Sequence, residues 1–354
     1  MTSVRADKAF YVLCLGIVAW AMVVFMYVRS LPPDSAAIEA ARMQEAAIAA
    51  VLAERLERGI PLDTINDPNG TGLVGVALSG LTSTAGILPA KRSAATPDAA
   101  ALLVRLLRKA GARPGTRVAV NASGSFPGFA LAAVAACAAL SLDADIVLSV
   151  GSSSWGANLE AYTVVDMLYA AMDQGAFPPG FADSLLAVTP GGSDDRGLDL
   201  DPAALEAALE RAGARGIRVI RPASLQEAVD ARMAAFRSRG EPDLLLTIGG
   251  NYASTGADPG LSLRSGIVTR PGKAGSGGTG LMQVFLSAGK PVIQVLNVRD
   301  LCARYGLPFD PHPLRPIGDA PVYHDGRPPA ALVAIPPLLA LALYAASRRR
   351  KPTR

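Results

Sequence analysis

The sequence predicts an α/β protein in which helices cover both faces of a mostly parallel, Rossmann-like sheet, with a transmembrane helix at the N-terminal and C-terminal ends. Two observations lead to this fold class. Between residues 72 and 327, apolar runs rich in Val and Ile alternate with amphipathic helical segments, and the runs lack the period-two alternation of strands that face water. An uncharged stretch stands on each side of this region, at residues 9–28 and 328–347.

The first uncharged stretch, residues 9–28, is long enough to cross a hydrocarbon core about 30 Å thick as a helix. A cleaved signal peptide is the alternative. Its apolar part would be about 7–15 residues long, with a small-x-small cleavage site after it. The run here is longer, and the sequence VRSLP at residues 28–32 offers no such site. We therefore expect an uncleaved anchor.

The second uncharged stretch, residues 328–347, is interrupted by Pro336 and Pro337, which a spanning helix tolerates where neighbouring groups satisfy the backbone. The basic tail RRRKPTR follows at residues 348–354, and such clusters stay in the cytoplasm. Residues 1–8, with Arg5 and Lys8 against Asp7, favour the same side. The sequence thus predicts a two-pass protein of the inner or plasma membrane, whose partner is the lipid bilayer, with residues 29–327 outside the cytoplasm.

The charge distribution supports this topology. The formal net charge is +4, but the tail carries five positive charges and the N-terminal flank a net one, which leaves −2 between the anchors. The sequence pI near 9.0 therefore reflects the cytoplasmic tail, and we expect no nucleic-acid partner.

Cysteine and histidine usage limits the chemistry. The chain has three Cys and two His, and their spacing matches no metal site, so no metal is predicted. Cys14 lies in the first apolar stretch. Cys137 and Cys302 could pair in an oxidising compartment, but we expect buried free thiols.

Residues 29–71 are predicted to be a juxtamembrane helix, at residues 35–58, followed by a turn-rich linker at residues 62–71. The α/β domain follows at residues 72–327. Its predicted strands are residues 73–78, 117–121, 145–150, 217–221, 243–248 and 291–298, and its predicted helices are residues 98–110, 127–140, 202–212, 225–239 and 281–288.

Four of the predicted strands end in loops of small polar residues. In parallel sheets the carboxyl ends of the strands share one edge, where ligands bind, so these loops predict a polar pocket. The alternative is that Gly and Ser only make tight turns between strands and helices. The predicted binding residues are Ser79, Thr82, Ser83, Thr84, Ser123, Gly124, Ser125, Ser154, Gly249, Gly250 and Asn251, together with the loop cations Lys91 and Arg92.

Weak catalytic candidates lie among these residues. Lys91 could activate Ser83 as a Ser–Lys pair. Ser123 is a second candidate, although Asn121 and Ser125 occupy the glycine positions of a Gly-x-Ser-x-Gly elbow. No complete catalytic set is visible, so whether the protein is an enzyme stays open.

Three further motifs bear on function. Residues 275–280, GSGGTG, match a dinucleotide fingerprint with Asp300 twenty positions beyond. However, RPGKA at residues 270–274 separates them from the preceding apolar residues 266–268, so the tight strand-to-helix turn is missing and we predict no cofactor. Asp194 and Asp195 are expected in a solvent loop, with a site carboxylate as the alternative. Trp155 is expected in the core, with a ligand platform as the alternative.

Several blocks resemble the family called poly-gamma-glutamate system protein: GVALSGLTST at residues 75–84, LPAKRS at 88–93, ASGSFP at 122–127, VGSSSWGA at 150–157 and GTGLM at 278–282. The similarity runs from about residue 72 to residue 323. That family accompanies the synthesis machinery of poly-gamma-glutamate, a surface or released polymer made at the bacterial membrane. The resemblance implies a pathway and, as partners, the membrane synthase complex and the polymer, but it carries over no residue roles.

Three hypotheses follow from residues and resemblance together. The protein is an accessory that binds or guides the exported capsule polymer, a hydrolase or transferase of gamma-amide bonds that uses Ser83 or Ser123 with Lys91, or a non-catalytic scaffold of the synthase. Because no complete catalytic set is visible, the sequence favours binding and scaffolding over catalysis.

Overall fold

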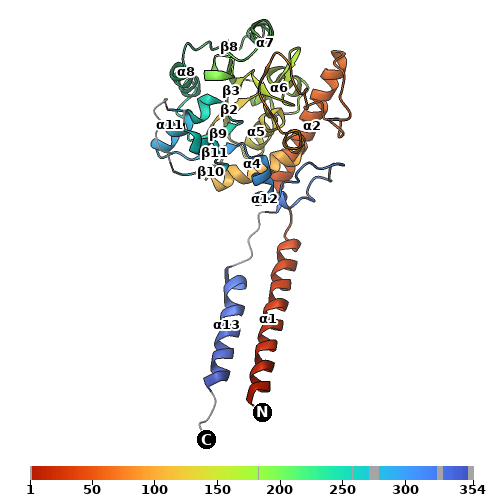
Figure 1. Cartoon of the computed structure of the whole chain (residues 1–354), viewed down its shortest axis with the longest axis vertical. Helices are drawn as coiled ribbons and strands as arrows, with labels where there is room; N and C mark the ends of the chain where they lie inside the picture. The colour runs from red at the N-terminus through yellow and green to blue at the C-terminus, as the bar shows by residue number, and fades with distance from the viewer. Residues whose placement is uncertain (1, 182, 257, 271–278, 325–329, 350–354) are drawn as a thin grey trace. The chain divides into compact units, whose positions relative to one another are not determined.

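The computed structural model describes residues 2–181, 183–256, 258–270, 279–324 and 330–349. The chain forms two compact units. One, which we call the body, is Ser35–Tyr323, and the other, the terminal unit, consists of Met1–Asp34 and His324–Arg354 (Figure 1).

The terminal unit contains helices α1 (Thr2–Ser30) and α13 (Ala330–Arg349), which contact each other. Within the described residues, α1 alone contains a stretch, Phe10–Tyr27, that is long and apolar enough to cross a membrane, and a signal sequence can be as long and as apolar. The apolar part of α13 runs only from Val333 to Ala345 and contains both Pro336 and Pro337. One apolar helix is therefore shown, at the N-terminal end.

A seven-stranded sheet forms the centre of the body, in the order β10-β11-β9-β2-β3-β7-β8. Its neighbouring strands are parallel except for β10 and β11, which are antiparallel. The predicted α/β fold with a mostly parallel sheet is confirmed. The strands are β10 (Gly266–Val268), β11 (Val292–Val295), β9 (Leu244–Ile248), β2 (Arg117–Ser123), β3 (Asp143–Ser149), β7 (Leu185–Thr189) and β8 (Arg218–Val219).

Helices cover both faces of this sheet. Successive residues of a strand point to opposite faces and therefore belong to different hydrophobic clusters. Val118 and Val120 of β2 belong to one hydrophobic cluster, and Ala119 between them belongs to the other. The first cluster includes α2 (Ser35–Glu57), α3 (Leu88–Ala94), α4 (Asp98–Lys109), α5 (Pro127–Ala139), α6 (Val164–Asp173), α7 (Pro202–Ala214) and α12 (Val298–Tyr305). The second includes α8 (Leu225–Arg237), α9 (Tyr252–Thr255) and α11 (Leu281–Ser287).

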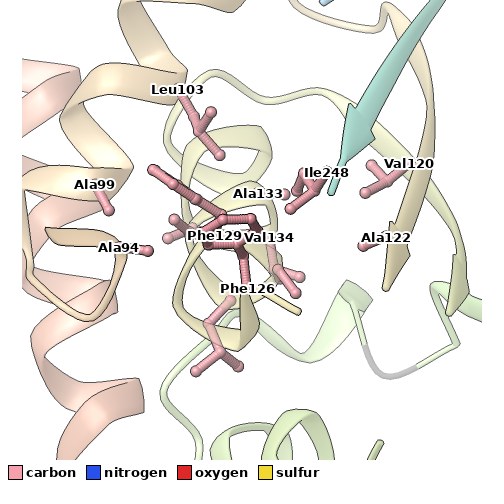
Figure 2. Close-up of a cluster of buried hydrophobic side chains, with 14 of the residues drawn as sticks. Ala94, Ala99, Leu103, Val120, Ala122, Phe126, Phe129, Ala133, Val134 and Ile248 are labelled. Atoms are coloured by element: carbon pink, nitrogen blue, oxygen red, sulfur yellow. The ribbon is translucent and has the colours of Figure 1, made fainter. Parts of the chain in front are cut away.

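The first cluster is built around two phenylalanines of the segment that begins α5. Figure 2 shows Phe126 and Phe129 between alanine and leucine side chains of α3 and α4 and the apolar residues of β2 and β9. Their ring centroids are 5.9 Å apart. This core holds the start of α5 firmly, directly after the loop that follows β2.

The predicted juxtamembrane helix forms as α2, and it belongs to the body. Its buried alanines, among them Ala40, Ala41 and Ala47, face α4, α5 and α6. Gln44 lies in the same seam, where its Nε2 donates a hydrogen bond of 3.0 Å to the carbonyl oxygen of Gly128 in α5. Small residues on both sides let the two helices approach closely.

Some predicted elements differ from those observed. Residues 73–78 do not form a strand, since their backbone is held by Trp155 and Asn158 outside the sheet. Strand β7 and helices α3, α6 and α12 were not predicted. Lys91 and Arg92 therefore lie in helix α3 and not in a loop, because Pro89 is compatible with the first turn of a helix.

Both thiols of the body, Cys137 and Cys302, are free and buried, as expected. Burial raises the pKa of Cys137 to about 12 and that of Cys302 to about 11. Neither thiol is suited to nucleophilic chemistry at neutral pH.

Candidate functional site

The chain order of the sheet reverses between β2 and β9. Strands β2, β3, β7 and β8 follow one another to one side, and β9 and β11 are then added on the other side of β2. At such a reversal the loops that follow the two central strands run in opposite directions and leave a crevice at the carboxyl edge.

A cavity of about 790 Å³ occupies this edge. It is lined by the segments that follow β2, β3, β7, β9 and β11, by the end of β1 (Thr82–Thr84), and by α3. The lining residues are Ser83, Thr84, Ala85, Gly86, Ile87, Ala90, Lys91, Ser123, Ser125, Phe126, Gly151, Ser153, Gly191, Gly192, Ser193, Asp199, Gly250, Asn251, Tyr252, Leu296, Asn297, Val298, Arg299 and Phe309.

The structure brings about half of the predicted binding residues together in this cavity. Those that line it are Ser83, Thr84, Lys91, Ser123, Ser125, Gly250 and Asn251. The predicted residues Ser79, Thr82, Arg92, Gly124, Ser154 and Gly249 do not belong to its lining.

The residues outside the lining have structural partners. Ser79 donates to the carbonyl oxygen of Asn158 at 2.5 Å, and Thr82 accepts a hydrogen bond from the Asn158 side chain at 2.8 Å. Arg92 makes two hydrogen bonds to Asp310, of 2.5 and 2.6 Å. This pairing raises the pKa of Arg92 and neutralises its charge locally.

The first polar loop reaches the cavity by a route that differs from the predicted one. Strand β1 pairs in parallel with β4 (Ser152–Ser153), in a two-stranded sheet separate from the main one. Within it, Ser83 Oγ donates a hydrogen bond of 3.1 Å to the carbonyl oxygen of Ser152. Because β4 directly follows β3, its pairing with β1 places β1 at the edge of the main sheet.

Lys91 is the most unusual residue of the cavity. A lysine with its ordinary pKa is charged at neutral pH, yet Lys91 is only 4% exposed. Its Nζ donates to the carbonyl oxygen of Ser125, lies 2.6 Å from Ser153 Oγ and stands 3.9 Å from the centre of the Phe126 ring. Desolvation lowers the pKa of Lys91 from 10.5 to about 7. Near neutral pH, a substantial fraction of this amine is uncharged.

A fully buried ion pair supports the loops that follow β2, β7 and β9. Arg232 of α8 binds Asp195 through both terminal nitrogens, and its Nε donates to Asn121 Oδ1 at 2.9 Å. Asn121 Nδ2 in turn lies 3.2 Å from Asn251 Oδ1 at the cavity. The expected solvent loop is therefore wrong for Asp195, which anchors the segment after β7, although Asp194 is exposed.

Several lining residues were not predicted from the sequence. Gly191, Gly192 and Ser193 were missed because β7, which precedes them, was not predicted. Arg299 was missed because residues 291–298 were expected to be a strand, whereas α12 begins at Val298. Phe309 was missed because it lies beyond α12, in a segment for which no element was predicted. Arg299 is exposed, with its guanidinium 4.9 Å from the centre of the Phe309 ring, and supplies a second cation to the cavity.

The other sequence motifs lie elsewhere. Residues 271–278, which include most of GSGGTG, are outside the described residues, and Asp300 lies in the first turn of α12, where it pairs with Arg304. Trp155 is half-buried, adopts a left-handed backbone with φ 64°, and does not line the cavity. Within the described ranges, no group of three His, Cys, Asp or Glu residues could hold a metal ion.

Comparison of this chain with protein-family models, with curated proteins and with solved structures finds no match.

Proposed function

We propose that this protein is a membrane-anchored accessory component of poly-gamma-glutamate biosynthesis or export, and that its cavity binds a segment of the polymer. The observation that carries the proposal is the cavity at the reversal point of the sheet, which is lined by Gly- and Ser-rich loops, by the amine of Lys91 and by the guanidinium of Arg299. Its volume of about 790 Å³ is typical of a ligand site.

The chemistry of this lining suits a polyanion with an amide backbone. Each residue of the polymer offers one carboxylate, which a cation or a peptide N–H can bind, and one amide, which polar loops can bind. The cations are few, and Asp199 adds a negative charge to the lining. The contact is therefore local, in agreement with the net charge of −2 between the two uncharged stretches.

The proposed location is the inner or plasma membrane, with α1 and the segment at residues 328–347 as two anchors and the body outside the cytoplasm. The basic tail at residues 348–354 and the length of α1 support this topology. Reporter fusions test it directly. Alkaline phosphatase inserted after residue 216, in the exposed turn before β8, is expected to be active, whereas phosphatase fused after residue 354 is expected to be inactive. An active C-terminal fusion would contradict the second crossing.

Polymer binding is tested with the full chain in detergent and fluorescent oligo-gamma-glutamate. Arg299→Gln removes a cation of the cavity and is expected to weaken binding tenfold or more, since a charge-assisted hydrogen bond contributes about 1.5–3 kcal/mol. Arg218→Gln is the matched control, because Arg218 is an exposed arginine on β8 outside the cavity. Equal affinity of wild type and Arg299→Gln, or no binding at all, would argue against the cavity as the polymer site.

Scaffolding is the outcome that remains if polymer affinity is absent. Co-purification with the polymer synthase complex, without affinity for the oligomer, would show that the body serves only to hold the complex together.

A further inference from the structure

Lys91 has the environment of a general base more than that of a salt-bridge partner. Among the residues that the structure describes, no carboxylate pairs with it, and its neighbours are the Ser125 carbonyl, the Ser153 hydroxyl and the Phe126 ring. A buried lysine without a counterion loses its proton readily, and an uncharged amine has a lone pair that can accept one.

Ser153 is held in place beside this amine. Its backbone N–H donates a hydrogen bond of 3.0 Å to Ser125 Oγ, and β4 is paired with β1 on the other side. Ser153 is 7% exposed and lines the cavity. The backbone of Ser153 is therefore held on two sides, and the residue borders the space where a ligand would lie.

A glycine keeps this pair accessible. A Cβ atom at Gly86 would lie 3.2 Å from Ser153 Oγ and 3.1 Å from Lys91 Cε, and it would clash with the carbonyl oxygen of Ser154. Gly86 itself lines the cavity. Any side chain at residue 86 would press on both functional groups, so glycine is required where the chain passes them.

We propose that Ser153 Oγ is a nucleophile for acyl transfer and that Lys91 Nζ is its general base. The neutral amine donates one N–H to the Ser125 carbonyl and takes the proton from Ser153 Oγ as that oxygen attacks the carbonyl carbon of an amide. The C–N bond then breaks, and the Lys91 ammonium returns the proton to the leaving nitrogen, which departs as an amine and leaves an acyl ester on Ser153.

The second half of the reaction regenerates the enzyme. Lys91 takes a proton from a water molecule as the water oxygen attacks the ester carbon, and the ester bond breaks to release a carboxylic acid. The proton on Lys91 passes to Ser153 Oγ. While Lys91 is charged, the Ser125 carbonyl and the face of the Phe126 ring stabilise its ammonium.

The geometry favours Ser153 over the two serines that the sequence suggested. Ser83 Oγ donates to the Ser152 carbonyl at 3.1 Å, and Ser123 Oγ lies 3.4 Å from the backbone nitrogen of Ser125. The side-chain hydroxyl hydrogen-bonded to Lys91 Nζ is that of Ser153, at 2.6 Å. Ser153 is therefore the serine that Lys91 can deprotonate directly.

The substrate of this reaction, a gamma-amide bond of the polymer, is inferred from the function proposed above. The reactivity of Ser153 does not depend on that assignment. Besides Lys91, the charged group on α3 is Arg92, which pairs with Asp310. Helix α12 contacts α3 and carries Arg299 and the pair Asp300–Arg304. Of these charged groups Arg299 lines the cavity, as does Asp199 from the segment after β7.

The full chain in detergent is treated with a fluorophosphonate, and the labelled peptide is identified by mass spectrometry. We expect a phosphonyl adduct on Ser153, formed at a rate that rises with pH through an inflection near 7, as Lys91 deprotonates. Ser153→Ala should abolish the adduct. Lys91→Met should slow labelling about a hundredfold or more and remove the inflection, while Ser238→Ala, at the end of α8, should leave the rate unchanged.

Several results would overturn the inference. These are an adduct on Ser83 or Ser123, equal labelling of wild type and Lys91→Met, or a rate that does not change with pH. A cooperative unfolding transition of each variant, well above the temperature of the labelling reaction, excludes loss of fold as the cause. In Lys91→Arg the charge is permanent, so slow labelling of a folded Lys91→Arg variant supports the base role, and fast labelling contradicts it.

A second measurement separates this inference from the proposed function. Oligo-gamma-glutamate is incubated with wild type and Ser153→Ala, and its length is measured by mass spectrometry. Shortening by wild type alone supports both proposals. Labelling of Ser153 without shortening supports the nucleophile and contradicts the gamma-amide as its substrate. Binding of the oligomer without labelling of Ser153 supports the proposed function and overturns the nucleophile.

Discussion

Two buried basic residues of the body, Arg232 and Lys91, have opposite kinds of surroundings. Arg232 is fully buried with a carboxylate, Asp195, and with the polar side chains of Asn121, Ser149 and Thr189. An arginine does not deprotonate in proteins, so burial requires such a complete set of partners. Lys91 can lose its proton instead, which is why it is buried with only a carbonyl, a hydroxyl and a ring.

Lys91 gives stability a pH dependence with a defined sign. Burial lowers its pKa in the folded protein from 10.5 to about 7, so between these values the unfolded chain binds more protons than the folded one. The free energy of unfolding therefore rises with pH in this window, by up to about 1.4 kcal/mol per pH unit. In Lys91→Met this contribution is lost.

The difference is measured by denaturant unfolding of wild type and Lys91→Met at pH 6, 8 and 9. Lys91→Met is expected to be the more stable protein at pH 6, and its advantage should shrink as the pH rises. A constant difference between the two proteins would contradict a lowered pKa of Lys91.

Removal of one member of the Arg232–Asp195 pair leaves an uncompensated charge. Asp195→Ala is expected to lower the free energy of unfolding by about 3–5 kcal/mol, whereas Asp195→Leu combined with Arg232→Met should cost less than Asp195→Ala alone. Denaturant unfolding gives both values.

The exposed pair Arg221–Glu206 offers a matched control, and Glu206→Ala should change stability by less than about 1 kcal/mol. Similar losses for Asp195→Ala and Glu206→Ala would refute the importance of burial.

At the scale of elements, helix α2 shows how an alanine-rich segment becomes part of a core. A helix with so many alanines has little apolar surface to bury, so its stabilisation depends on close approach to α4, α5 and α6. The seam contains a hydrogen bond from Gln44 to α5 and buries Ala40, Ala41 and Ala47 completely. Larger side chains in this seam would separate the helices.

Two adjacent alanines test this packing. Ala47 is fully buried in the seam, whereas Ala46 next to it is exposed. Ala47→Leu is expected to lower the free energy of unfolding by about 1–3 kcal/mol, because the extra volume cannot be accommodated. Ala46→Leu should change it by less than about 0.5 kcal/mol. If both substitutions have the same effect in denaturant unfolding, α2 does not pack as described.

At the scale of the whole molecule, the boundary of the body lies before α2 and not after it. Arg55, near the end of α2, is 2% exposed and donates to the carbonyl oxygens of Gly72 and Val74, each at 2.9 Å. Helix and linker therefore complete the body, and the domain cannot be separated at residue 72 without breaking this network.

Two truncations test this boundary. A fragment of residues 35–323 is expected to be soluble and to unfold cooperatively, because it contains the whole compact unit. A fragment of residues 72–323 exposes the apolar surfaces of α4, α5 and α6 that α2 covers, and it is expected to aggregate. Circular dichroism and size-exclusion chromatography distinguish the two, and a well-folded 72–323 fragment would contradict the assignment of α2 to the body.

Elements with a strong local pattern could be predicted from the sequence. Strands β2, β3 and β9 are apolar runs with clear boundaries, and α4 has a strong helical periodicity with Asp98 in its first turn. Strand β7 is a short run between loops, and α3 spans only Leu88–Ala94 with proline in its first turn. Such short elements are stabilised by their neighbours, so their own residues carry a weak signal.

The sequence by itself determined the layered α/β class, the N-terminal apolar helix and the polar character of the strand-end loops. These features depend on residue periodicity and composition over short distances. Only the tertiary structure decided which serine lies beside Lys91, since Ser153 is 62 positions away along the chain and reaches it through the pairing of β1 with β4. Burial, which lowers the pKa of Lys91 and pairs Arg232 with Asp195, is likewise a property of packing between distant segments.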